Sequence, residues 1–226
     1  MKKWKFLTAA ALTLMLAACG SDEETSTSGD TNEPAQTQDT TENKETAATA
    51  VFPMTVSPLS TDSETEDGKS VTFEDVTFKE MPKNIVVFDY GFLDTLDALG
   101  VEGIVGIAAN GGKGNFPEHL KEKYLTDSIA DVGSLKAIDF EKVAAANPDA
   151  IFISGRQSAY YEELKEITPN VVFIGSDNEK YIDGVFETVD LAAKIFDKED
   201  KAEELKANLQ AKVDQVKEKR KERKER

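Results

Sequence analysis

The stretch from Gly133 to Ser158, GSLKAIDFEKVAAANPDAIFISGRQS, decides the fold of this chain. Its pattern predicts a turn, a helix, a second turn, a strand and a loop, in that order. Asp139 stands where a helix needs an N-cap acceptor, and Asn147-Pro148-Asp149 ends the helix because the residue before a proline avoids helical backbone angles. The run Ala150–Ile153 is wholly apolar, which is typical of a parallel strand covered on both faces.

A polar loop, Ser154-Gly155-Arg156-Gln157, directly follows this predicted strand. In open α/β sheets ligands bind at the carboxyl ends of the strands. An arginine offers several donors in one plane and is weakly hydrated, so it suits oxygen-rich anions. Arg156 is therefore a candidate ligand-binding residue, and Gln157 could add a further donor. The alternative is a surface arginine in a loop without a ligand.

The rest of the chain repeats the same alternation of strands and helices. Apolar runs at Ile85–Phe88, Ile104–Ile107 and Val171–Ile174 predict further buried strands, each followed by a helical pattern. We therefore expect an α/β fold with a mainly parallel sheet flanked by helices. Upstream of it, alternating apolar residues between Val71 and Phe78 predict a hairpin that turns at Glu74-Asp75.

The spacing G-x-x-x-x-x-(D/N)-(F/L)-E-x-(V/I)-x-x-x-x-P-D-x-(I/V), found here at Gly133–Ile151, resembles the ferric-siderophore and cobalamin binding proteins of ABC importers. The sequence SGRQS at Ser154–Ser158 resembles the catecholate branch of that family, and the similarity runs from about Lys83 to the end of the chain. The resemblance implies a two-lobe, helical-backbone (class III) binding protein with no resident cofactor. The implied ligand is a ferric siderophore, with an anionic catecholate favoured, and the implied partner is an ABC permease with its ATPase.

The resemblance also assigns roles to single residues. In the family, arginines of both lobes form a basic pocket, and Arg156 matches one of them. Lys113 lies in a glycine-rich loop where the family often has a basic residue, although a solvated lysine is an equal alternative. Tyr90 follows the first strand and could stack on a ligand ring or pack in the core. Glu141 matches the glutamate that docks into permease arginines; from the residues alone, it favours the helix dipole.

The first residues of the chain predict export and lipidation. Residues 1–18 combine a lysine-rich start with an apolar run too short for a stop-transfer helix. Leu16-Ala17-Ala18-Cys19 matches a lipobox, and Cys19 is the single cysteine of the chain. An ordinary secretory signal is the alternative. We expect Cys19 to carry a lipid that anchors the protein to the extracytoplasmic face of the cell membrane.

Composition divides the remaining chain into three parts. Residues 19–68 hold twelve acidic residues and one lysine and few large apolar residues, which predicts a disordered linker. We expect residues 69–197 to form the amino-terminal lobe and residues 198–226 to form one long amphipathic helix, with a sparse apolar stripe that ends at Val216. In the resembling family this helix crosses to a second lobe, which we expect to be absent from this chain.

Several functions are disfavoured. A net charge of −16 argues against nucleic acid as a partner. The single histidine, His119, has no metal-site spacing around it, and no catalytic set stands out, so we expect neither a metal site nor an enzyme. A degenerate hydrolase-like enzyme is disfavoured for the same reason. The remaining alternatives are a structural or adhesive surface lipoprotein and a cobalamin or haem binder of the same fold.

Overall fold

A parallel sheet forms the centre of the protein. The computed structural model describes residues 50–112, 116–175 and 181–225. Within these residues the main sheet has five strands in the order β7-β6-β5-β8-β9, all paired in parallel. They are β5 (Ile85–Val87), β6 (Ile104–Ile107), β7 (Ala130–Asp131), β8 (Ala150–Ile153) and β9 (Val171–Phe173). The predicted α/β fold with a mainly parallel sheet is confirmed.

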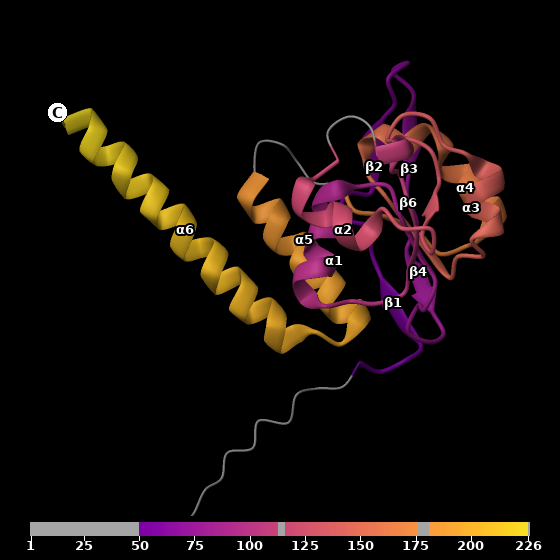
Figure 1. The fold of residues 1–226 in the computed structure, drawn as a ribbon, viewed down its shortest axis with the longest axis horizontal. Helices are drawn as coiled ribbons and strands as arrows, with labels where there is room; N and C mark the ends of the chain where they lie inside the picture. Colours follow the sequence, from indigo (N-terminus) through magenta and orange to yellow (C-terminus); the bar gives the residue numbers. More distant parts are fainter. Residues whose placement is uncertain (1–49, 113–115, 176–180, 226) are drawn as a thin grey trace, which may run out of the picture. The chain divides into compact units, whose positions relative to one another are not determined.

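Helices cover both faces of this sheet. On one face lie α1, α2 and α5, and on the other lie α3 and α4 (Figure 1). The α-helices are α1 (Tyr90–Leu99), α2 (Lys121–Tyr124), α3 (Phe140–Ala145), α4 (Tyr161–Ile167), α5 (Tyr181–Phe196) and α6 (Glu199–Glu225). Short 3-10 helices are η1 (Asn110–Gly112), η2 (Glu118–Leu120) and η3 (Gly155–Tyr160).

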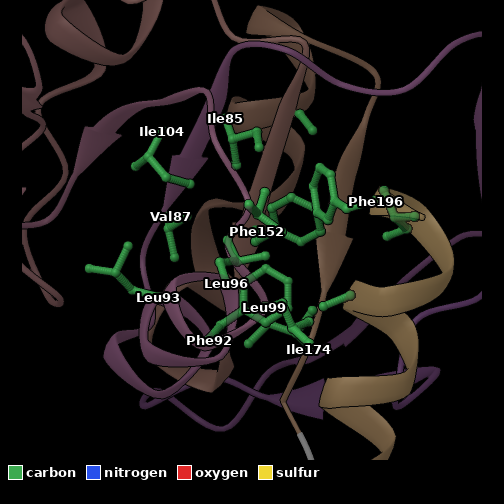
Figure 2. Packing of buried hydrophobic residues seen from close by; sticks show 14 of the residues in the cluster. Ile85, Val87, Phe92, Leu93, Leu96, Leu99, Ile104, Phe152, Ile174 and Phe196 are labelled. Atoms are coloured by element: carbon green, nitrogen blue, oxygen red, sulfur yellow. The ribbon is translucent and has the colours of Figure 1, made fainter. Parts of the chain in front are cut away.

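The core is split into two clusters by the sheet. Ile85 and Val87 of β5 face the first cluster, and Val86 between them faces the second. The first cluster contains apolar residues of α1 and α5, among them Leu96 and Phe196 (Figure 2). Each fully buried side chain of this kind contributes about 1.5–3 kcal/mol relative to its exposed state. Burial on both faces explains why the strands read as unbroken apolar runs.

The turn and the helix start in the stretch from Gly133 have local causes. Gly133 has φ 102°, and a Cβ at this position would lie 2.3 Å from the carbonyl oxygen of Ala137. Only glycine fits such a close approach in this backbone conformation. Asp139 accepts a hydrogen bond from the Lys142 backbone N–H at 3.1 Å, so it is the N-cap of α3, as predicted.

Asp149 links the end of the same stretch to the central strand. Its carboxylate accepts hydrogen bonds from the backbone N–H groups of Lys83 and Asn84, at 2.8 and 2.9 Å. These two residues directly precede β5. The aspartate of the Asn147-Pro148-Asp149 turn therefore holds the start of β5 beside the start of β8, in addition to ending the helical segment.

The predictions for the chain upstream of β5 are partly wrong. β1 (Met54–Val56) pairs with β4 (Val76–Phe78), and β2 (Asp62–Glu64) pairs with β3 (Ser70–Thr72). Residues 50–68 are thus not a disordered linker, and β3 and β4 do not form a hairpin with each other. These strands are three residues long and polar at their exposed positions. These strands are ordered because partner strands pair with them and because Met54 and Val56 contact the core. Composition alone reveals neither of these contacts.

The long helix expected near the end of the chain is present as α6. Its first turns pack against α1 and α5, with Ala202 buried and Leu205 against the first core cluster. The apolar stripe loses its contacts farther on, and Val216 is 57% exposed. No helix among the described residues is both long and apolar enough to span a bilayer.

Candidate functional site

The topology of the sheet has a switch point at the carboxyl ends of β5 and β8. From β5 the chain continues outward to β6 and β7 on one side, whereas β8 and β9 lie on the other side. Such a switch point separates the loops that follow the two strands, and ligands of open α/β sheets bind there. Tyr90 follows β5 and Arg156 follows β8. The structure therefore brings these two predicted site residues to the same edge of the sheet, which we call the carboxyl edge.

Arg156 is presented by η3 at the carboxyl edge. Its side chain is exposed, and it forms no ion pair with any residue in the described ranges. The guanidinium is thus available to an anion from solution, and the ligand-binding role of Arg156 stays a prediction.

Gln157, by contrast, is fully buried and is not a ligand contact in this structure. Its amide oxygen accepts a hydrogen bond from the Ser154 backbone N–H at 3.1 Å, and its amide nitrogen donates to the carbonyl oxygen of Leu135. Both polar ends of the side chain are therefore occupied. Gln157 ties η3 to the loop between β7 and α3, and so it positions its neighbour Arg156. The prediction that Gln157 contacts ligand is corrected to this role.

Tyr90 lies half-buried at the start of α1. Its hydroxyl donates a hydrogen bond to the carbonyl oxygen of Ala108 at 2.8 Å, and its ring meets the edge of Phe116 with centroids 5.1 Å apart. Burial raises the pKa of the Tyr90 phenol, and the negative charge of Asp131 adds to the effect. The hydroxyl therefore already has a hydrogen-bond partner within the fold, and only part of the ring is available to a ligand.

The loop after β6 is held by one carboxylate. Asp131 accepts hydrogen bonds from the backbone N–H groups of Asn110 and Gly133, both at 3.1 Å, and from that of Gly111. This arrangement holds η1 at the carboxyl edge. Lys113, the predicted basic residue of the same loop, lies outside the described residues, so its contribution stays a prediction.

Lys136 is a site residue that sequence reasoning missed. It lies in a turn whose backbone donates to the Ser134 hydroxyl, and its ammonium group contacts the Glu66 carboxylate at 2.7 Å. The hydrogen bond and charge of Lys136 lower the pKa of Glu66, and the charge of Arg156 lowers it further. Lys136 therefore contacts Glu66 directly, whereas Arg156 makes no ion pair with it. Lys136 stands in the GSLKA sequence, but only the topology places that loop beside η3.

The other predicted residues lie away from the carboxyl edge or outside the described residues. Glu141 is exposed in the first turn of α3 and has no ion-pair partner within the described part of the chain. His119 contacts Asp94 at 2.7 Å on the surface, and no cluster of metal-ligating side chains occurs among the residues described. Cys19 lies outside the described residues.

Three comparisons with known proteins agree with this architecture. The petrobactin-binding protein YclQ of Bacillus subtilis (strain 168) is 44% identical over 140 residues, which make up 60% of this chain and 41% of YclQ. The crystal structure of YclQ matches 70% of this chain and 52% of that chain, with a TM-score of 0.59 and 37% identity. The periplasmic catecholate-siderophore binding protein VctP from Vibrio cholerae matches 76% of this chain and 56% of its own, with a TM-score of 0.59 and 26% identity.

These matches also define what the chain covers. It spans about two fifths of the length of the curated relatives it matches (41%). The model of the periplasmic binding protein family matches residues 85–226, from the first residue of β5 through α6. The resemblance inferred from Gly133–Ser158 is confirmed by this match. The chain belongs to the periplasmic binding protein family.

Proposed function

We propose that this chain is the first lobe of an extracytoplasmic solute-binding protein of an ABC importer, and that its ligand is an anionic ferric siderophore of the catecholate type. The observation that carries the proposal is the exposed Arg156, which follows β8 at the switch point of the sheet, with Lys136 in the neighbouring loop that Gln157 ties to η3. The names of two relatives support it, since YclQ is a petrobactin-binding protein and VctP a catecholate-siderophore binding protein.

The chemistry of such a chelate fits the residues at the carboxyl edge. A ferric tris-catecholate carries several negative charges spread over aromatic oxygens. Arg156 can donate to those oxygens and stack on a ring, whereas Lys136 supplies a point charge. Each charge-assisted hydrogen bond contributes about 1.5–3 kcal/mol. The exposed part of the Tyr90 ring adds an aromatic surface, and Lys113 is expected to add a further positive charge.

The proposal includes delivery and anchoring. Glu141 is exposed on α3 and free of ion pairs within the described residues, so its carboxylate can reach arginines of a permease. Cys19 would carry the lipid that holds the protein at the extracytoplasmic face of the cell membrane. With these roles, the chain would capture a chelate outside the membrane and transfer it to a permease with its ATPase.

The binding test needs a probe other than tryptophan fluorescence, because the single tryptophan, Trp4, lies in the predicted signal peptide. We suggest titrating the isotope-labelled chain, from residue 20 onward, with the diamagnetic gallium(III) complex of enterobactin and following backbone NMR signals. Saturable shifts are expected at residues 89–91 and 154–158. The gallium complex of ferrichrome, a neutral tris-hydroxamate, serves as the comparison ligand.

Arg156→Ala is expected to weaken binding of the anionic complex by about tenfold or more, since 1.4 kcal/mol corresponds to a factor of ten. Arg220→Ala removes the same charge from an exposed position of α6 and should leave the dissociation constant unchanged. An equal effect of both substitutions, or tighter binding of the neutral complex, would contradict the proposal.

A further inference from the structure

The hairpin formed by β2 and β3, residues 62–72, places an acidic side chain against Lys136 at the carboxyl edge. Glu66 lies in the turn of this hairpin, and its carboxylate contacts the Lys136 ammonium at 2.7 Å. The charge of Arg156 also acts on it. In Figure 1 this hairpin lies at the opposite end of the domain from β1 and β4. The inference below rests on the proposed function.

The turn of the hairpin is well ordered by its own hydrogen bonds. Thr65 and Lys69 are joined by a backbone bond of 2.8 Å, and the Thr65 hydroxyl accepts from the Lys69 N–H at 3.0 Å. Lys69 also pairs with Asp67 at 2.7 Å, so the lysine of the turn is already neutralised by its neighbour. Glu66 therefore pairs with Lys136 of the main domain and not with Lys69 of its own turn.

The root of the hairpin is fixed to the core. Phe73, directly after β3, stacks on Phe173 with centroids 3.9 Å apart and meets Tyr161 edge-on at 5.0 Å. β2 itself lies beside η3, where a Cβ at Gly155 would be 4.0 Å from the Ser63 hydroxyl. The hairpin is thus held next to the loop that carries Arg156, and the Glu66 contact follows from this placement.

We propose that Glu66 is a built-in counter-ion that competes with the ligand for Lys136, next to the loop that carries Arg156, and that it thereby favours highly charged chelates. An exposed ion pair shifts an equilibrium by only a factor of about 1.5 to 5, so a multiply charged ligand displaces the carboxylate readily. A neutral compound gains no charge attraction from Lys136 and does not displace the carboxylate. Glu66 acts by occupying Lys136, not by touching the ligand.

A double-mutant cycle tests this competition. Dissociation constants for gallium(III) enterobactin are measured by NMR titration for the unmodified chain, Glu66→Gln, Lys136→Gln and the double variant. Glu66→Gln is expected to tighten binding about two- to fivefold, because Lys136 is released. In the Lys136→Gln background the same substitution should change binding by less than about 1.5-fold. Glu64→Gln, on the same hairpin and without an ion pair among the described residues, controls for net charge.

The outcomes separate this inference from the proposed function. Equal tightening by Glu66→Gln and Glu64→Gln would overturn the inference, because the effect would then be one of overall charge. Weaker binding by Glu66→Gln would overturn it too, since Glu66 would then be a ligand contact. If no variant gives a saturable shift with either gallium complex, the proposed function fails and the inference with it. If binding is lost in Arg156→Ala but is unchanged by Glu66→Gln, only the counter-ion inference is overturned and the proposed function stands.

Discussion

Replacing Gln157 by Leu should unfold η3 locally and destabilise the whole domain. The substitution nearly keeps the size of the side chain but removes its three hydrogen bonds, from the Ser154 N–H and hydroxyl and to the Leu135 carbonyl. The Ser154 bonds are buried, and the Leu135 bond is partly buried. Leaving a buried group without a partner costs about 1–3 kcal/mol. We therefore expect a loss of about 2–4 kcal/mol in the free energy of unfolding.

The assay is urea unfolding followed by circular dichroism, combined with a thermal melt. For a folded region of this size, each kcal/mol lowers the melting temperature by about 2–4 °C, so a fall of roughly 5–15 °C is expected. Gln210→Leu is the matched control, because Gln210 bonds only to Asp214 one turn along the exposed part of α6. Its loss should be no more than about 0.5 kcal/mol.

A second readout distinguishes positioning from stability. Because Gln157 holds the segment that carries Arg156, the variant should also lose affinity for gallium(III) enterobactin when it is measured at a temperature where it is fully folded. Gln157→Glu keeps the acceptor for Ser154 but places a buried carboxylate against the Leu135 carbonyl oxygen, so at neutral pH its loss of stability should be at least as large as that of Gln157→Leu. A variant that is as stable as the unmodified chain would refute the assignment of Gln157 to the fold.

Three further predictions can be checked independently. Cys19→Ser should move the protein from the membrane fraction to the soluble fraction with an unchanged melting temperature, and an unchanged membrane fraction would contradict lipidation. Gly133→Ala should lower the free energy of unfolding by about 1–3 kcal/mol. The added Cβ would lie 2.3 Å from a carbonyl oxygen, and the backbone at this position has a left-handed conformation. An unchanged free energy of unfolding in urea would contradict this prediction. The pKa of the Glu66 carboxyl, measured by NMR, should lie below the ordinary value of a glutamate and return toward it in Lys136→Gln. Because the folded pKa is lowered, the stability that this pair contributes is present above the unfolded pKa and is lost as the pH falls through the folded pKa; a titration unaffected by Lys136→Gln would contradict the pair.

The sequence by itself determined the elements that depend on local chemistry. Unbroken apolar runs such as Ala150–Ile153 identified the central strands, because strands covered on both faces need no polar positions. Asp139 and Asn147-Pro148-Asp149 marked the limits of a helix, since caps and prolines act within a few residues. The same logic placed Arg156 at the end of a strand, and this is where the structure has it.

The tertiary structure decided what depends on residues far apart in the chain. The short strands β1 and β2 escaped prediction because three polar or weakly apolar residues become ordered only when β4 and β3 supply partners. Gln157 was assigned to the ligand because the sequence does not show that Leu135 lies within reach of its amide. Lys136 and Glu66 are 70 positions apart, and only the packing of β2 against η3 makes them an ion pair beside Arg156. Local patterns thus identify the strand and the cation that follows it, whereas the surroundings of that cation arise from contacts that no local pattern encodes.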